Sequence, residues 1–136
     1  MLTYLSGHPE WRDRAKAEVE ALIASNCAST SPLSSLSIHL SSIPLATWES
    51  DTPILDSIIR ETLRVAQPHT AMRRNLGPEL YIEGKVVPTG AYIVYPFSDV
   101  HLDPELYPDP WRFDPGRETA KSAYGYVGWG GGQSNG

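Results

Sequence analysis

One segment, residues 53–65, constrains the fold of this chain more than any other. Its apolar residues recur at the spacing that builds one buried helix face; they are Ile54, Leu55, Ile58, Ile59 and Leu63. Pro53 suits the first helical position, where no amide donor is needed, and Thr52 can cap the start. The segment therefore predicts an amphipathic helix whose apolar face has to be buried against a core.

Two opposite charges stand near the end of this predicted helix. Glu61 and Arg64 are three residues apart, so their side chains share a face and can meet. Taken alone, such a pair is a surface salt bridge that contributes about 0.3–0.5 kcal/mol. A more specific interpretation depends on the motifs that follow the helix.

The first half of the chain is predicted to be mainly helical. Residues 1–23 form a helical region with a buried stripe, made of Trp11, Ala15, Val19, Leu22 and Ile23. The charged residues of this region, Glu18 among them, are expected to face water. Residues 24–50 are rich in Ser, Thr and Pro and show no persistent period, which predicts a long loop with at most one helical turn. The charged helix described above then occupies residues 51–66.

The second half is predicted to contain short strands and turns. Residues 69–72 should run extended, because Pro68 stops the helix. Residues 80–82, 85–87 and 91–95 are apolar runs separated by turns at 83–84 and 88–90, which predicts one small antiparallel sheet over residues 69–95. Residues 96–136 are rich in Pro, Asp and Gly and are expected to form an irregular meander.

Composition excludes several function classes. The 11 Lys and Arg against 16 Asp and Glu give a net charge of -5, which provides no basic field for nucleic acid or an anionic membrane. The single cysteine, Cys27, can form neither an internal disulfide nor a multi-cysteine zinc site, and we interpret it as an incidental thiol. No run is long enough to be a membrane-spanning helix, and the start lacks a signal-peptide pattern.

The order of the motifs resembles the C-terminal part of a cytochrome P-450, a haem-thiolate monooxygenase. The motifs are Glu61-x-x-Arg64, Arg74, His101-Leu-Asp-Pro104, the run from Pro110 to Arg117, and the Gly-rich run at 129–132. The resemblance implies an α+β chain, the C-terminal part of the mainly helical P-450 fold: two main helices, a small antiparallel sheet and a Pro- and Gly-rich meander. The whole chain, 1–136, would be a partial P-450 domain that ends in a truncated haem-binding loop.

The resemblance also implies roles for individual residues. Glu61, Arg64 and Arg117 would form a buried ion-pair network that supports the loop beneath the haem, a structural role rather than an acid-base one. Arg74 would bind a haem propionate, although the adjacent Arg73 is an alternative. The residues that would line the substrate site are His69, Thr70, Ala71 and Met72. His101 is expected to be a packed or hydrogen-bonded histidine.

The Gly-rich end carries the main departure from the family pattern. Trp129 stands where an aromatic residue is expected, and Gly132 matches a glycine of the haem loop. Ser134 occupies the usual Arg or His position, and Gly136 falls where the ligating cysteine belongs. A haem iron needs an axial donor, and glycine has none. We therefore expect no catalytic residue and no metal ligand in this chain, and expect it to be inactive as it stands.

The first functional hypothesis is thus a fragment of a haem-dependent monooxygenase, with haem as the family cofactor but not retained by this chain. The resemblance implies a reductase as electron donor, a small apolar organic substrate, and an endoplasmic-reticulum location through an N-terminal anchor that this chain lacks. A truncated gene model, a frameshift or a decayed copy would each leave this ending. The alternative is a small non-catalytic interaction domain, which would unfold cooperatively instead of aggregating.

Overall fold

The structure, a computed structural model, describes residues 1–26, 40–66, 69–118, 122 and 124–128. It divides into two compact units. Unit 1 comprises Met1–Thr62 and Phe113–Arg117, and unit 2 comprises Leu63–Arg112 and Glu118–Gly136. Helix α5 (Pro53–Ala66) contributes residues 53–62 to unit 1 and residues 63–66 to unit 2. Each unit is described by itself.

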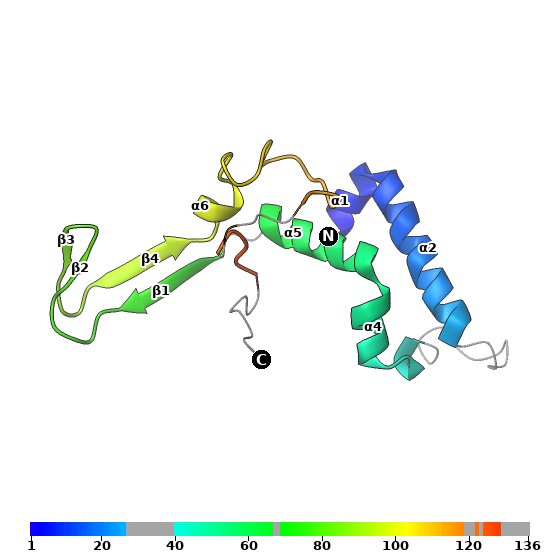
Figure 1. The fold of residues 1–136 in the computed structure, drawn as a ribbon, viewed down its shortest axis with the longest axis horizontal. Helices are drawn as coiled ribbons and strands as arrows, with labels where there is room; N and C mark the ends of the chain where they lie inside the picture. Colours follow the sequence, from blue (N-terminus) through cyan, green and yellow to red (C-terminus); the bar gives the residue numbers. More distant parts are fainter. Residues whose placement is uncertain (27–39, 67–68, 119–121, 123, 129–136) are drawn as a thin grey trace. The chain divides into compact units, whose positions relative to one another are not determined.

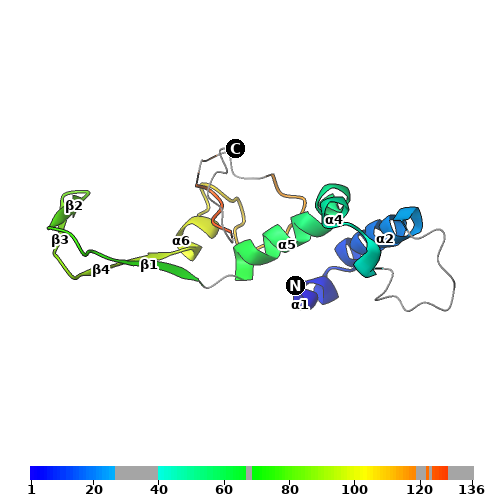
Figure 2. The same cartoon turned by 90° about the horizontal axis from the view of Figure 1, so that it is seen from below.

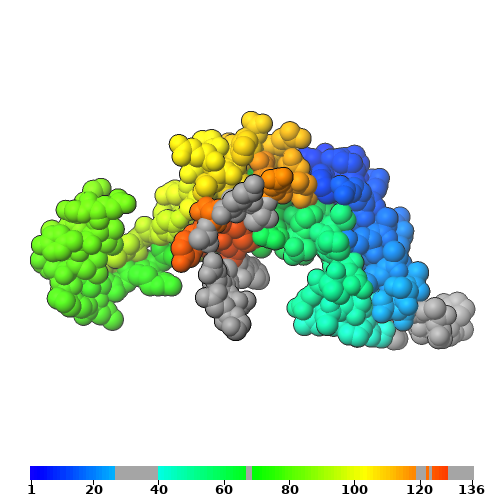
Figure 3. All heavy atoms as spheres, in the orientation of Figure 1, coloured from blue at the N-terminus to red at the C-terminus, as the bar shows by residue number. Residues whose placement is uncertain are grey.

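Unit 1 is built from helices and one returning turn (Figures 1 and 2). Its helices are α1 (Leu2–Gly7), α2 (Pro9–Asn26), α4 (Leu45–Asp51) and the first part of α5. The core cluster contains Leu5, Ala15, Ile58 and Phe113, with Tyr4, Trp11 and Ile54 packed against it. In the space-filling view the residues of α1, in dark blue, lie beside the orange turn at 113–117 (Figure 3). The apolar stripes of α2 and α5 thus meet in one core, although Ile59 of the predicted stripe is 41% exposed.

The start of α5 is capped differently from the prediction. The carboxylate of Glu18 accepts hydrogen bonds from the amides of Ile54 and Leu55, both at 2.8 Å. Thr52 does not cap α5 with its side chain, because its hydroxyl donates to the carbonyl of Trp48. Two predictions were therefore wrong: Thr52 as the cap, and Glu18 as a fully solvated charge. A carboxylate at a helix N-terminus satisfies free amides and interacts favourably with the helix dipole, so a tertiary contact replaced the local cap.

The predicted loop at 24–50 is wrong at both of its ends. Helix α2 continues to Asn26, and α4 occupies Leu45–Asp51. Pro44 precedes α4 in an extended conformation, and its carbonyl accepts hydrogen bonds from the amides of Thr47 and Trp48. A helix of seven residues is too short to show a clear hydrophobic period, which explains why the sequence pattern missed it.

The described residues of unit 2 form two separate two-stranded sheets instead of the single predicted sheet. Strands β1 (Thr70–Arg74) and β4 (Tyr92–Pro96) pair antiparallel, with Met72 opposite Val94. Strands β2 (Leu80–Ile82) and β3 (Lys85–Val87) form a short hairpin at the far end of that ribbon from α6 (Figures 1 and 2). The hairpin turn places Glu83 and Gly84 at positive φ, as a two-residue turn of the primed type requires.

Asn75 separates the two sheets and is buried. Its side-chain amide donates to the carbonyls of Pro78, Val87 and Pro88, and its backbone pairs with Gly90 and Ala91. These bonds close the base of the β2–β3 hairpin and end the β1–β4 ladder. Sequence periodicity cannot reveal such a residue, because its partners are backbone groups of the hairpin and the turn that follows it.

The segment after β4 is more regular than predicted. Helix α6 (Ser98–His101) begins directly after Phe97, whose carbonyl accepts the amides of Val100 and His101. The prediction that residues after Pro96 hold no regular element was therefore wrong, because a single helical turn needs no apolar period. Beyond α6 the described residues form turns, as expected for a meander. Helices, small antiparallel sheets and meander together agree with the predicted α+β class.

Candidate functional site

In unit 1 the carboxylate of Glu61 is buried and engaged by the turn at Phe113–Arg117. The side chain of Glu61 is 6% exposed, and its Oε1 accepts the backbone amide of Asp114 at 3.0 Å. The same oxygen lies 3.5 Å from Nε of Arg117, whose side chain is 13% exposed. A buried carboxylate persists only when it is paired and hydrogen-bonded, and both conditions are met here. Glu61 and Arg117, predicted as members of one network, are thus brought together.

The turn that carries Arg117 is held by packing as well as by charge. Phe113 stacks on Tyr4, with ring centroids 4.8 Å apart, and its ring also contacts His8. Gly116 lies against Trp11, where an added Cβ would come within 3.3 Å of the indole. The aromatic residues of α1 and α2 therefore determine where the guanidinium of Arg117 lies.

In unit 2 the guanidinium of Arg64 is buried among backbone carbonyls. The residue is 3% exposed. Its Nη1 donates to the carbonyls of His101 and Pro110, at 2.6 and 2.7 Å, and its Nη2 donates to the carbonyl of Arg112 at 3.3 Å. One planar side chain on α5 thereby ties three points of the meander, an arrangement suited to the multiple donors of arginine.

Tyr107 completes this cluster and was not predicted from the sequence. It is 3% exposed, and its ring lies 4.9 Å from the Arg64 guanidinium carbon, a cation-π contact. Its hydroxyl donates to the carbonyl of Gly125. Tyr107 lies in a proline-rich part of the meander that shows no periodic pattern. Only the three-dimensional contacts therefore identify it.

His101 is fully buried in the same cluster. Its Nε2 accepts the backbone amide of Val127 at 2.9 Å, and its ring stacks on Tyr126 at 5.3 Å. Burial, and next to it the positive charge of Arg64, lower the pKa of His101 below its usual value of 6.5. The expectation of a packed, hydrogen-bonded histidine agrees with these contacts.

Arg74 and Arg73 lie at the end of β1, and both are exposed. Nε of Arg74 donates to the carbonyl of Gly90 at 3.2 Å, and the guanidinium lies 5.5 Å from the Tyr92 ring. Arg73 donates to the carbonyl of its neighbour Met72. Arg74 is therefore the more firmly oriented of the two, with a backbone and an aromatic contact across the strand pair.

The four residues predicted to line a substrate site lie at the start of β1. Ala71 is partly buried, and the exposed members are His69, Thr70 and Met72. The main chain here is extended, as the sequence indicated. Three of the predicted loop residues, Trp129, Gly132 and Ser134, lie outside the described residues, as do Gly136 and Cys27.

The sequence model of the family described as cytochrome P-450 matches residues 1–135. The chain belongs to the cytochrome P-450 family. Among curated relatives, it is 38% identical over 142 residues to the cytochrome P-450 monooxygenase AacuE of Aspergillus aculeatus, an alignment that covers 98% of this chain and 28% of that protein. It is 34% identical to the cytochrome P-450 monooxygenase dmxR5 of a Cryptosporiopsis species, over 98% of this chain and 26% of that protein.

A solved P-450 structure supports the same assignment. The retinoic-acid-bound cyanobacterial CYP120A1 superimposes with a TM-score of 0.58 and 27% identity, covering 88% of this chain and 24% of that one. The chain therefore spans about a quarter of the length of the P-450 proteins it matches. Both the recognised family and the predicted fold class are confirmed.

A P-450 haem needs a cationic partner for its propionates and an axial thiolate, and the described residues can be compared with both needs. A guanidinium has five N–H donors, so Arg74, which uses Nε on Gly90, keeps donors for a propionate carboxylate. An axial thiolate is the second requirement. Over the described ranges no cluster of three or more His, Cys, Asp or Glu can hold a metal ion. The geometry of Arg74 is thus compatible with the predicted propionate contact, which stays a prediction.

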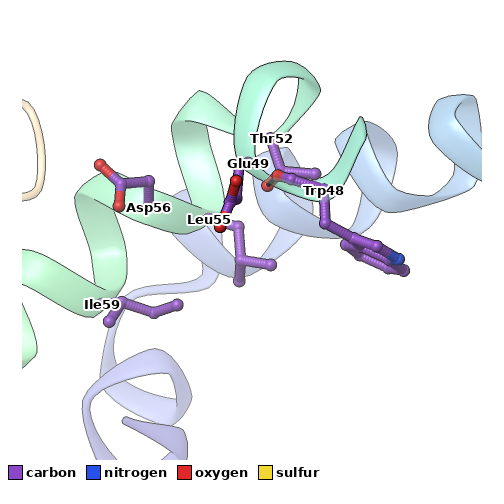
Figure 4. Close-up of a pocket in the computed structure, with 6 residues that line it drawn as sticks. All are labelled: Trp48, Glu49, Thr52, Leu55, Asp56 and Ile59. Carbon is purple, nitrogen blue, oxygen red and sulfur yellow. Dashed lines mark hydrogen bonds between the residues drawn. The ribbon is translucent and has the colours of Figure 1, made fainter. Parts of the chain in front are cut away.

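Two further features of this P-450 chain lie apart from the predicted site residues. None of the helices described is long and apolar enough to span a bilayer. A pocket of about 300 Å³ in unit 1 is lined by α4 and α5 (Figure 4); its residues are Trp48, Glu49, Thr52, Leu55, Asp56 and Ile59. None of these is a predicted site residue, and the pocket takes no part in the function proposed below.

Proposed function

We propose that this chain is the C-terminal supporting part of a haem-dependent monooxygenase, which inserts one oxygen atom into an organic substrate. The observation that carries the proposal is the buried Glu61 carboxylate, which binds the amide of Asp114 and lies beside Arg117. The match of the family model over nearly the whole chain supports the same conclusion. When haem is bound through a thiolate, it supplies the electron push that favours O–O cleavage.

The residues of the chain would hold and orient the cofactor and take no part in proton transfer. Glu61 with Arg117, and Arg64 with its carbonyls, would fix the meander. Arg74 would hold a propionate, and residues 69–72 would face the substrate. Trp129 and Gly132 would contact the haem. Because Gly136 has no donor atom at the ligand position, the 136-residue chain by itself would not form a thiolate-bound haem.

The family also supports a proposal for the substrate and the partner. The P-450 structure similar to this chain is described as bound to retinoic acid, a mostly hydrocarbon molecule. This supports a small apolar organic substrate for the intact protein. A reductase would supply the electrons, and the net charge of -5 offers no attraction to nucleic acid.

A haem titration tests the ligand assignment directly. The chain is mixed with ferrous haem and carbon monoxide, and the Soret band is recorded for the unchanged chain, for Gly136→Cys and for Cys27→Ser. We expect no thiolate-type band from the unchanged chain and a gain of that band in Gly136→Cys. A thiolate-type band in the unchanged chain that survives Cys27→Ser would contradict the proposal, whereas one that disappears would identify Cys27 as an unexpected ligand.

A further inference from the structure

The residues that immediately precede the predicted haem loop are held by contacts to side chains of the meander and α6. Val127 donates its amide to His101 Nε2 at 2.9 Å. Tyr126 stacks on the same imidazole, with an interplanar angle of 23°. The carbonyl of Gly125 accepts the hydroxyl of Tyr107. Three consecutive residues are thus fixed within unit 2, and His101 accounts for two of the three contacts.

His101 is itself rigidly placed. Its side chain has no exposed surface, and its backbone amide donates to the carbonyl of Phe97 at 3.0 Å. Its carbonyl accepts Nη1 of Arg64 at 2.6 Å. The ring is thus fully buried, and both the backbone amide and the backbone carbonyl of His101 are hydrogen-bonded. These contacts hold the ring in one position, where it binds the segment that follows.

The hydrogen bond to Val127 determines the protonation state of the ring. A backbone amide can only donate, so Nε2 of His101 has to be the unprotonated acceptor. The proton of the neutral ring then lies on Nδ1, which is buried and has no hydrogen-bond partner among the described residues. Burial and the charge of Arg64 both lower the pKa of His101, which favours this neutral form at pH 7.

We propose that His101 is a positioning residue that fixes residues 126–127 at the entrance to the haem-contacting loop, and that adding a proton to its ring releases them. A doubly protonated imidazole has two donors and no acceptor. Its Nε2 and the Val127 amide would then both be donors, and the hydrogen bond between them would be lost. The inference rests on the proposed function, since this segment matters as the lead into the haem loop.

The charged groups near His101 favour release of Val127 when the ring is protonated. None of those described below offers the protonated ring a new contact in its place. Arg64 on α5 is the charge that acts on the ring, and it is positive. Tyr126 and Phe97 pack against the imidazole through their rings. On the same stretch, Asp99 is exposed, and the Asp103 carboxylate already accepts the amide of Glu105.

The tautomer can be measured in the unchanged chain. Ring ¹⁵N shifts of the labelled full-length chain at neutral pH, assigned by the signal lost in His101→Gln, report which nitrogen carries the proton. We expect a neutral His101 protonated on Nδ1, with Nε2 shifted as a hydrogen-bond acceptor. A ring protonated on Nε2, or charged at pH 7, would overturn the proposal, and the shifts themselves are read in the unchanged chain.

Amide hydrogen exchange tests the positioning role. His101→Phe keeps the ring but removes the acceptor, so exchange at Val127 should accelerate by about five- to tenfold. His101→Gln offers a carboxamide oxygen and should restore part of the protection. The amide of Tyr107, bonded to the Asp103 carbonyl, is the internal reference, and His69→Gln, a change at an exposed histidine of unit 2, is the matched control. Equal exchange at Val127 in all chains would refute the role of His101.

These observables are independent of haem. If the tautomer and the exchange pattern are as expected but the Gly136→Cys chain binds no haem through a thiolate, the proposed function fails and the His101 contact stands. If a thiolate-bound haem forms but His101 carries its proton on Nε2, only the positioning role fails.

Discussion

Glu61 and Arg64 are three residues apart on one helix, yet the two units neutralise them in different ways. Glu61 has a backbone amide and a guanidinium as neighbours. Arg64 has three carbonyl oxygens and an aromatic ring. The contacts described for Glu61 thus include an opposite charge, and those described for Arg64 include three neutral dipoles. Both buried charges thus have the hydrogen-bonding partners that burial requires.

The comparison predicts that loss of Arg64, which binds three carbonyls, lowers stability more than loss of the Glu61 charge. Arg64→Met should destabilise unit 2 by about 3–5 kcal/mol, because it leaves up to three carbonyls of the meander without their donor in a buried site. Urea unfolding, with hydrogen exchange at His101 and Tyr107 to locate the effect, measures this change.

The matched control is Arg73→Met, which removes an exposed arginine bonded to the carbonyl of its own neighbour. It should change stability by less than about 0.5 kcal/mol. Similar losses from both variants would mean that the carbonyl contacts of Arg64 contribute little, and the comparison would fail at its main point.

The carboxylate in unit 1 should be less sensitive to loss of charge alone. Glu61→Gln keeps an oxygen that can accept the Asp114 amide but removes the charge beside Arg117, so we expect a loss of about 1–3 kcal/mol. Glu61→Ala removes both and should cost more. Chemical denaturation of the two variants separates the hydrogen bond from the ion pair.

The double variant Glu61→Gln with Arg117→Met provides the coupling energy. If the two losses simply add, the contact at 3.5 Å contributes nothing as an ion pair. A coupling of about 1 kcal/mol or more would show that the ion pair itself stabilises unit 1.

Much of this arrangement could be predicted from the sequence, and the parts that could not share a physical cause. The helix carrying Glu61 and Arg64 was predictable from its apolar period, and the turn at Glu83 and Gly84 from its residue types. The contacts that decide the sites are tertiary. Glu18 caps α5 from 36 residues away, and Arg64 reaches carbonyls 37 to 48 residues away. Carbonyls belong to every residue, so no side-chain pattern marks the ones that a guanidinium will bind.

The division of the predicted sheet has the same origin. Apolar alternation identified the strand residues but not their partners. The side chain of Asn75 binds carbonyls at the base of the β2–β3 hairpin, which separates this hairpin from the β1–β4 ribbon. One buried amide thus marks the boundary between the two sheets, and its contacts depend on where the turns bring the backbone, which local periodicity does not encode.

Acidification tests the carbonyl cluster without any mutation. The pKa of His101 is lowered in the folded chain, so between that value and 6.5 the unfolded chain binds more protons than the folded one. The contribution of His101 to stability is therefore complete above pH 6.5 and is lost progressively as the pH falls towards the folded-state pKa. The slope from this one group cannot exceed about 1.4 kcal/mol per pH unit.

Urea unfolding between pH 7.5 and 5 measures that slope, and His101→Gln, which cannot take up a proton, should flatten it. Once the exchange rate of Val127 is corrected for its intrinsic dependence on pH, its protection should fall as the pH is lowered over the same range. The reason is that the protonated ring no longer accepts the Val127 amide. An equal slope in both chains would place the titrating group elsewhere. It would also show that protonation of His101 does not account for the loss of stability at low pH.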